Sequence, residues 1–218
     1  MSSRPLIFIH IPKTAGTSFI TAVKQSAMRS IFDYGIDSPS TSPEVVESIY
    51  RSNCVPLLIE FIKENNVQFL AGHEVYKYIN SLVSIGRLCT IFRNPVQRVV
   101  SEYNHFVKHY KYTSSIQTFI ADPNIRNRQF KLMGGLELDQ LYFFGFTEDY
   151  KYSLRLFNIL GGFDLPNLID NVGRQNLDDT WVVDDDILDL IKYYNEQDML
   201  LYVQAKKLFN EKWGDLIN

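Results

Sequence analysis

The sequence predicts an α/β protein with a central parallel sheet and helices on both faces. Short apolar runs rich in β-branched and aromatic residues alternate along the chain with longer segments of helical periodicity. Two of these runs, 5–10 and 87–92, are each followed directly by a turn and then by a helical pattern. Such alternation favours parallel strands in one sheet, with ligands bound at their carboxyl ends.

The first half of the chain holds two of the predicted strands. Residues 5–10 (PLIFIH) predict the first strand, and residues 17–30 carry a helical pattern. Residues 33–43 are rich in Ser, Pro, Asp and Gly, which indicates a surface loop. An amphipathic helical pattern then returns over 55–65, and residues 67–71 predict the second strand.

The second half repeats the alternation. Residues 87–92 predict a third strand that ends before an Asn-Pro pair, and Pro in the first turn favours the helix predicted over 96–108. A fourth apolar run at 141–146 precedes a helix over 150–160, which a Gly-Gly pair ends. Residues 195–213 place apolar side chains at helical spacing.

Length and charge restrict the architecture and the partners. The 218 residues, of which 45% are hydrophobic, suffice for one substantial core, so we expect a single domain over 1–218. The formal net charge of -3 gives no global positive field, so we expect no nucleic-acid partner. The oligomeric state cannot be read from these features.

Cysteine usage and the N-terminal region bear on the compartment. Cys54 and Cys89 lie far apart in the sequence, which favours core thiols in a reducing compartment. The apolar stretch 6–11 is short and runs into Lys13 instead of a small-residue cleavage site. We therefore expect a cytoplasmic protein without a signal peptide or a membrane span.

The first motif, residues 11–18 (IPKTAGTS), lies between a predicted strand and a helix. Backbone N–H groups of such a turn converge on an anion. The lysine precedes the glycine, so the segment departs from the triphosphate-binding loop G-x-x-x-x-G-K-[ST]. Taken alone, it is equally compatible with an ordinary turn that carries an exposed lysine.

The second motif, residues 90–101 (TIFRNPVQRVVS), also lies at a strand-to-helix junction. Arg93 ends the strand, where a guanidinium can reach a phosphate. Ser101 follows about two helical turns later and can add a hydroxyl only if the helix runs beside the same anion. The alternatives are a surface serine, and for Arg98 a surface ion pair.

Together the two segments resemble the PAPS-dependent sulfotransferases, most closely the carbohydrate group, where PAPS is 3'-phosphoadenosine-5'-phosphosulfate. The resemblance implies a three-layer P-loop-like fold and transfer of a sulfuryl group to a hydroxyl acceptor, with a glycan expected and no metal required. It implies that the first loop holds the 5'-phosphosulfate and that R-[DN]-P-x-x-R-x-x-S-x-[YW] holds the 3'-phosphate. The implied donor-binding residues are Lys13, Thr14, Ala15, Gly16, Thr17, Ser18, Arg93 and Ser101.

Later segments extend the resemblance. Residues 127–132 resemble the N-x-Q-x-x-L element of the heparan sulfate 2-O and 6-O sulfotransferases, and residues 145–148 fit a G-x-x-E element. Residues 164–218 match only loosely. The membrane anchor and stem of the Golgi enzymes are not seen, which indicates a bacterial, viral or otherwise soluble relative.

Transfer to an alcohol requires a base for the hydroxyl proton and a cation for the leaving phosphate. His73 follows the strand at 67–71, and in the carbohydrate sulfotransferases a histidine after this strand is the catalytic base. His10 and Glu74 are the other candidates. Lys13 is expected to neutralise the leaving phosphate, which makes His73 and Lys13 the expected catalytic pair.

Several alternatives stay open. His105 and His109 have a spacing compatible with metal binding, but no third ligand is evident. A small-molecule kinase would need a Walker lysine and a magnesium carboxylate, neither of which is found, and a non-catalytic nucleotide- or glycan-binding module is the second alternative. The acceptor is set by loops whose shape the sequence does not give. Tyrosines such as Tyr103, Tyr110 and Tyr112 are expected to pack before they bind sugar.

Overall fold

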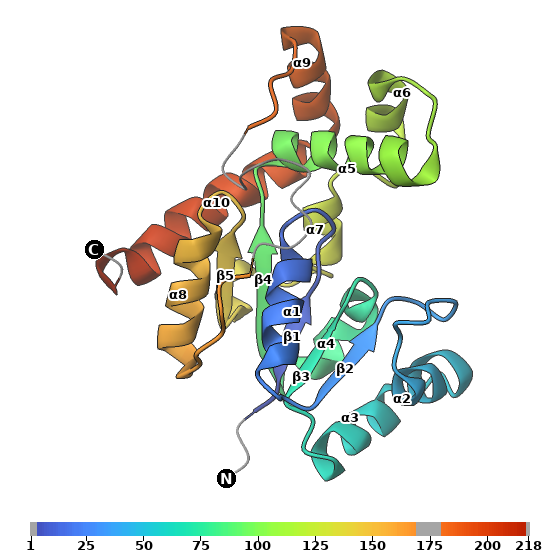
Figure 1. Cartoon of the computed structure of the whole chain (residues 1–218), viewed down its shortest axis with the longest axis vertical. Helices are drawn as coiled ribbons and strands as arrows, with labels where there is room; N and C mark the ends of the chain where they lie inside the picture. Colours follow the sequence, from blue (N-terminus) through green and yellow to red (C-terminus); the bar gives the residue numbers. More distant parts are fainter. Residues whose placement is uncertain (1–3, 169–179, 217–218) are drawn as a thin grey trace.

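The computed structural model describes residues 4–168 and 180–216. Within these residues, five parallel strands form one sheet in the order β2-β3-β1-β4-β5 (Figure 1). The α/β prediction is therefore confirmed. The strands are β1 (Leu6–Ile9), β2 (Ser30–Asp33), β3 (Phe69–Gly72), β4 (Arg87–Phe92) and β5 (Phe143–Phe146).

Helices fill the connections between the strands. The α-helices are α1 (Gly16–Gln25), α2 (Pro43–Val45), α3 (Val55–Glu64), α4 (Ile79–Leu82), α5 (Pro95–Tyr110), α6 (Ile116–Ala121), α7 (Arg128–Leu132), α8 (Tyr150–Gly161), α9 (Asp185–Tyr194) and α10 (Glu196–Trp213). A π-helical turn, η1 (Val46–Arg51), and the 3₁₀ turns η2 (Val75–Tyr78), η3 (Leu138–Gln140) and η4 (Gly214–Leu216) complete the described chain.

The alternation of side chains along β5 shows that helices cover both faces of the sheet. Phe143 packs edge-on against Phe157 of α8, with ring centroids 5.1 Å apart. Phe144, which points to the opposite face, packs against Trp213 of α10 at 5.1 Å. Phe19 of α1 lies 5.0 Å from Phe157, so α1 and α8 share one face, in front of the strands in Figure 1.

The sequence did not predict strand β2. The surface loop expected over 33–43 begins one residue too early, because Asp33 belongs to β2. Asp33 is fully buried at the end of β2. Its carboxylate accepts hydrogen bonds from the hydroxyls of Tyr50, at 2.6 Å, and Tyr78, at 2.8 Å. A buried carboxylate is tolerated when such donors surround it, and these donors lie far away in the sequence.

Other expectations are corrected in detail. The first helix ends at Gln25, not near residue 30, because Ser26 turns its hydroxyl back onto the carbonyl of Val23 at 2.6 Å and Ala27 takes a left-handed φ of 59°. Cys89 is buried as expected, whereas Cys54 is only half-buried. No helix in the described ranges is long and apolar enough to cross a membrane.

A second hydrophobic cluster lies apart from the main core and involves α5, α6 and α9. Its buried members are Val96, Val99, Val100, Ile120, Ile187 and Ile191. Helix α10, by contrast, contributes Leu201, Ala205, Phe209 and Trp213 to the main core. Residues 164–218 resemble the sulfotransferases only loosely in sequence, but their described part contributes to the main core.

Candidate active site

The parallel register gathers the predicted site residues at one edge of the sheet. Ile9 of β1 lies opposite Gly72 of β3 and Thr90 of β4. The segments that follow these three strands carry His10, His73 and Arg93. Because parallel strands end at the same edge, residues far apart in the sequence become neighbours there.

The loop between β1 and α1 has an unusual backbone. Lys13 and Ala15 adopt left-handed conformations, with φ of 68° and 64°. Thr14 between them is fully buried, and its hydroxyl donates to the carbonyl of Ile11 at 2.9 Å. Alternation of left-handed and other conformations at a helix N-terminus turns successive N–H groups toward one point, which is a geometry that binds anions. Thr17 is exposed and Ser18 is buried in the first turn of α1.

Gly16 is required by the packing of His10. A Cβ atom at Gly16 would lie 2.2 Å from Cδ2 and 2.5 Å from Nε2 of the His10 ring. The His10 ring is buried, and its Nδ1 lies 3.1 Å from the hydroxyl of Tyr34. The glycine therefore lets the helix N-terminus approach the imidazole closely.

Arg93 is fixed on both its backbone and its side chain. Nη1 of the guanidinium donates to the carbonyl oxygen of Lys13 at 3.0 Å. The side-chain amide of Gln129, in α7, accepts from the Arg93 N–H and donates to the Arg93 carbonyl, both at 2.9 Å. The guanidinium is thus held against the loop between β1 and α1.

The Asn-Pro turn after β4 is held from two sides. Asn94 caps α5 by accepting from the backbone N–H of Val96 at 3.0 Å. Its own N–H donates to the carboxylate of Glu148 at 2.8 Å, and Glu148 also accepts from the hydroxyl of Tyr202 at 3.1 Å. Burial raises the pKa of Glu148. The G-x-x-E element therefore supports the turn that carries Arg93.

Arg98 is not the surface ion-pair partner that the sequence suggested. Its side chain is 0% exposed, and Nη1 lies 2.5 Å from the carboxylate of Glu102. Nη2 donates to the carbonyl of Ile125 at 3.1 Å. Arg98 therefore points from α5 into the interior, where it binds the segment before α7. Ser101, on the same helix, is half-buried.

His73 is oriented by the strand beside it. Its Nδ1 lies 2.6 Å from the carbonyl oxygen of His10. A carbonyl oxygen only accepts, so Nδ1 carries the hydrogen and Nε2 is the unprotonated nitrogen of the neutral ring. Burial lowers the pKa of His73. Burial also holds the pKa of His10 well below its usual value, and the charges of His73 and Lys13 lower it further.

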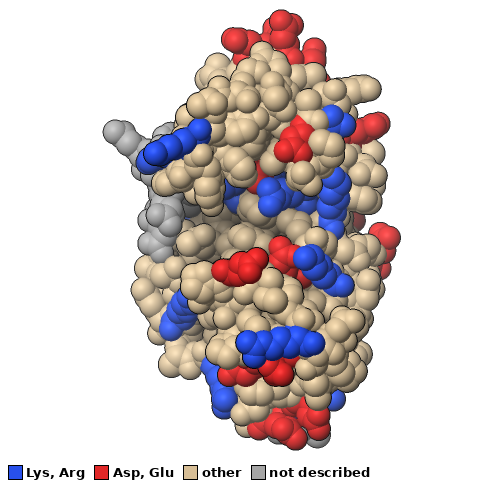
Figure 2. Space-filling model, turned by 90° about the vertical axis from the view of Figure 1, so that its right-hand side faces the viewer, with Lys and Arg blue, Asp and Glu red and all other residues tan. Residues whose placement is uncertain are grey.

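The lysine of the loop is partly shielded from water. Burial lowers the pKa of Lys13, while the carboxylate of Glu102 raises it. Figure 2 shows one face of the molecule, hollowed near its middle, with basic side chains gathered along part of the rim. Local positive charge therefore exists on a chain whose net charge is negative.

The other candidate residues make contacts of their own. Glu74 forms an ion pair with Lys77 of η2. His105 and His109 stack with ring centroids 4.5 Å apart, and the part of the chain that is described contains no group of three or more His, Cys, Asp or Glu placed to hold a metal ion. Tyr103 packs against the ring of Phe119 at 5.6 Å, as the packing interpretation expected.

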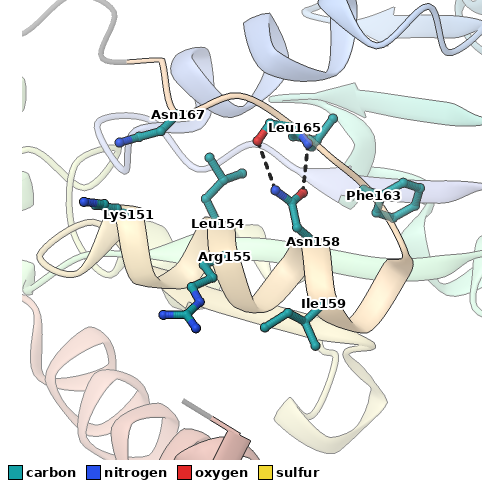
Figure 3. Close-up of a pocket in the computed structure, with 8 residues that line it drawn as sticks. All are labelled: Lys151, Leu154, Arg155, Asn158, Ile159, Phe163, Leu165 and Asn167. Carbon is teal, nitrogen blue, oxygen red and sulfur yellow. Dashed lines mark hydrogen bonds between the residues drawn. The ribbon is translucent and has the colours of Figure 1, made fainter. Parts of the chain in front are cut away.

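A surface pocket of about 350 Å³ lies elsewhere, along α8 and the segment after it (Figure 3). The amide of Asn158 ties the two walls together by donating to the Leu165 carbonyl at 3.0 Å and accepting from its N–H at 3.1 Å. None of the residues predicted from the sequence lines it. Its lining residues are Lys151, Leu154, Arg155, Asn158, Ile159, Phe163, Leu165 and Asn167.

Sequence reasoning missed several residues that shape this site. Arg128 and Gln129 belong to the N-x-Q-x-x-L element, so the sequence marked them, but it did not indicate what this element contacts. Glu102 directly follows Ser101 in the second motif. Tyr34 carried no signal, since it fell in a segment read as a surface loop.

Comparison with known proteins identifies the family and the fold of the chain. The model of the sulfotransferase family matches residues 2–133. No curated protein matches the chain. A solved sulfotransferase from Alicyclobacillus acidocaldarius is 14% identical in sequence, covers 95% of this chain and 96% of its own, and superposes with a TM-score of 0.52, which shows the shared P-loop-like fold. The chain therefore belongs to the sulfotransferase family, enzymes that move a sulfuryl group from PAPS to a hydroxyl-bearing acceptor.

Proposed function

We propose that this enzyme sulfates a carbohydrate hydroxyl and that His73 is its general base. The observation that carries the proposal is the 2.6 Å contact between Nδ1 of His73 and the carbonyl of His10. This contact leaves Nε2 as the proton acceptor, and burial favours the neutral ring at neutral pH.

His10 and Glu74 fit the role less well. The ring of His10 is buried against Gly16, and its Nδ1 lies 3.1 Å from the Tyr34 hydroxyl. Glu74 is paired with Lys77. We assign His10 to the support of His73, through its carbonyl oxygen and through a tilted ring contact with centroids 4.2 Å apart.

The donor is proposed to lie across the two motifs. The N–H groups of the loop, from Lys13 to Ser18, would hold the 5'-phosphosulfate at the N-terminus of α1. Arg93 and Ser101 would hold the 3'-phosphate. The hydrogen bond from Arg93 to the Lys13 carbonyl supports this arrangement, because it joins the two phosphate sites through one guanidinium.

In the proposed reaction, the acceptor oxygen forms a bond to sulfur while the bond between sulfur and the 5'-phosphate oxygen breaks. The hydroxyl proton passes to Nε2 of His73, and 3'-phosphoadenosine-5'-phosphate (PAP) leaves. Lys13 neutralises the charge that develops on the leaving phosphate. Glu102 favours the charged form of Lys13, which this role requires.

The resemblance to the carbohydrate sulfotransferases supports a sugar acceptor. Tyr110, at the end of α5, is 67% exposed. An exposed aromatic ring can stack on the apolar face of a sugar, and we propose this residue as an acceptor contact.

The experiment compares His73→Ala with His109→Ala, a matched change at an exposed histidine on α5. Single-turnover transfer of labelled sulfate from PAPS to mixed glycans, PAP affinity and melting temperature are measured on each preparation. His73→Ala should lower the transfer rate by roughly a hundredfold to ten-thousandfold with PAP affinity nearly unchanged. Near-normal transfer by folded His73→Ala protein would refute the assignment, and parallel His10→Ala and Glu74→Gln variants would then test the two remaining candidates.

A second experiment tests the 3'-phosphate site. PAP should raise the melting temperature much more than AMP at matched concentration, because only PAP engages Arg93 and Ser101. Arg93→Ala should remove this difference. Equal shifts for the two nucleotides in the unmodified protein would contradict the proposed site.

A further inference from the structure

Three ring side chains form a row across the carboxyl edge of the sheet. The last residues of β1 and β2 both lie opposite Gly72, the last residue of β3. The residues that come next are His10, Tyr34 and His73, so they occupy neighbouring positions on the three strands. The rings of His10 and His73 lie 4.2 Å apart, and Tyr34 meets them edge-on at 5.8 Å and 5.0 Å. The three rings therefore form one cluster.

The two nitrogens of the His10 ring face different elements. Nδ1 lies 3.1 Å from the hydroxyl of Tyr34. The Cδ2–Nε2 edge lies against Gly16, the first residue of α1, where an added Cβ would be 2.5 Å from Nε2. The residue is only 6% exposed, and no group within 4–168 and 180–216 hydrogen-bonds to Nε2. A polar atom of a buried side chain normally has a partner, so Nε2 indicates a ligand at this helix N-terminus.

The contact with Tyr34 bears on which nitrogen of His10 carries the hydrogen. Burial raises the pKa of Tyr34 to about 12, so its hydroxyl keeps a proton to donate. Burial also holds the pKa of His10 well below its usual value, so the ring is neutral at neutral pH. If Tyr34 donates to Nδ1, the neutral ring carries its hydrogen on Nε2. The opposite tautomer would present a lone pair to the site, which disfavours an anion.

The backbone of Tyr34 is fixed by the turn that follows it. Its N–H donates to the hydroxyl oxygen of Thr41 at 2.9 Å. That hydroxyl in turn donates to the carbonyl of Gly35 at 2.7 Å. The phenol therefore approaches His10 from a turn that its own hydrogen bonds close.

We propose that the His10 imidazole donates from Nε2 to the 5'-phosphate of PAPS, and that the Tyr34 hydroxyl fixes this tautomer by donating to Nδ1. His10 is then a donor-binding residue, and Tyr34 is a positioning residue that acts through it. The inference rests on the proposed function, which puts the 5'-phosphosulfate at the N-terminus of α1. A neutral histidine at a helix N-terminus is an established kind of hydrogen-bond donor in enzymes.

The first test determines the tautomers of the two neighbouring histidines. Long-range proton–nitrogen NMR spectra of the imidazoles are recorded for the full chain at neutral pH, with His10→Gln to assign the signals. His10 should carry its hydrogen on Nε2, whereas His73 should carry it on Nδ1, which faces the His10 carbonyl. Tyr34→Phe, which loses only the hydroxyl, should populate the Nδ1–H form of His10. A His10 hydrogen on Nδ1 in the unmodified protein would overturn the proposal.

The second test measures the affinity for PAP and for adenosine 3'-phosphate, which lacks the 5'-phosphate, by calorimetry. His10→Leu should weaken PAP binding roughly tenfold to a hundredfold, as expected for a hydrogen bond to a charged group, and should change adenosine 3'-phosphate binding by less than about twofold. His10→Gln, whose amide nitrogen can take the place of Nε2, should lose less. Tyr34→Phe should show the same selectivity with a smaller loss. All three variants keep the His10 carbonyl that orients His73.

The matched control is Tyr142→Phe. This tyrosine precedes β5, at the opposite edge of the sheet, and its hydroxyl donates to the carbonyl of Leu160 at 2.7 Å. The control should bind both nucleotides as the unmodified protein does. If His10 were purely structural, His10→Leu would melt at a lower temperature and would weaken both nucleotides equally or neither, and that result would overturn the proposal. Should His10→Leu fail to fold, Tyr34→Phe decides, and unchanged PAP affinity in that variant overturns it.

Failure of the proposed function would give a different result. If the unmodified protein binds neither PAPS nor PAP, the donor site itself fails, and this inference fails with it. If PAP binds with the expected preference over AMP but folded His10→Leu protein binds PAP normally, the donor site stands and only the role of His10 fails.

Discussion

Replacing Gly16 by Ala should both destabilise the protein and disturb His73, the proposed base. The new Cβ would lie 2.2 Å from Cδ2 of His10, whereas unstrained carbon contacts are about 3.5–4.0 Å. The ring cannot easily retreat, because it is buried and its Nδ1 lies 3.1 Å from the Tyr34 hydroxyl. The loop or the imidazole must therefore move by more than about 1 Å.

The size of the effect follows from two opposing contributions. Overpacking of a rigid site costs about 1–3 kcal/mol. Replacing glycine by alanine in a helix gains up to about 1 kcal/mol, so a mid-range overpacking cost of about 2 kcal/mol leaves a net loss of about 1–2 kcal/mol. For a chain of this length, the melting temperature should fall by about 2–8 °C. Transfer should fall as well, since the displaced residue carries the carbonyl that orients His73.

The matched control is Gly214→Ala, at a position where an added Cβ meets nothing within 4 Å. This variant should melt at or slightly above the temperature of the unmodified protein. Melting temperature and single-turnover transfer are measured for both variants. If Gly16→Ala melted within about 1 °C of Gly214→Ala and transferred sulfate normally, the close packing of His10 on the loop would be refuted.

Further predictions concern stability, donor binding and metals. Asp33→Ala should lower the free energy of unfolding by about 2–4 kcal/mol in urea titrations, because the buried Tyr78 hydroxyl and the half-buried Tyr50 hydroxyl lose their acceptor; Asp33→Asn should lose less. Gln129→Leu should weaken PAP affinity, measured by calorimetry, because the Arg93 backbone loses both of its hydrogen bonds to the side-chain amide of Gln129. Because the pKa of His10 is lower in the folded than in the unfolded protein, the unfolded chain takes up the His10 proton at a higher pH. The melting temperature should therefore fall as pH drops from about 7 to about 5. The fall should be less steep in His10→Gln. Chelation of divalent metals should leave transfer intact, and a complete, reversible loss with EDTA would contradict the roles given to Lys13 and the loop.

The sequence by itself determined the strand-turn-helix units and the order of the two motifs. Local signals sufficed there, because buried parallel strands read as apolar runs and Pro and Gly mark the turns. Those units placed Lys13, His73 and Arg93 at the ends of three strands. Parallel topology then brought them to one edge of the sheet without any further information.

Only the tertiary structure decided how these residues are held and which polar groups are buried. Strand β2 is four residues long, and its Asp33 is stabilised by hydroxyls 17 and 45 residues away in the chain. The carboxylate of Glu102 meets Arg128 from another helix, 26 residues further on, and it also pairs with Arg98, which is buried and not on the surface. Contacts between residues so distant in sequence leave no periodic trace in either segment, because each partner looks locally like an ordinary exposed polar residue.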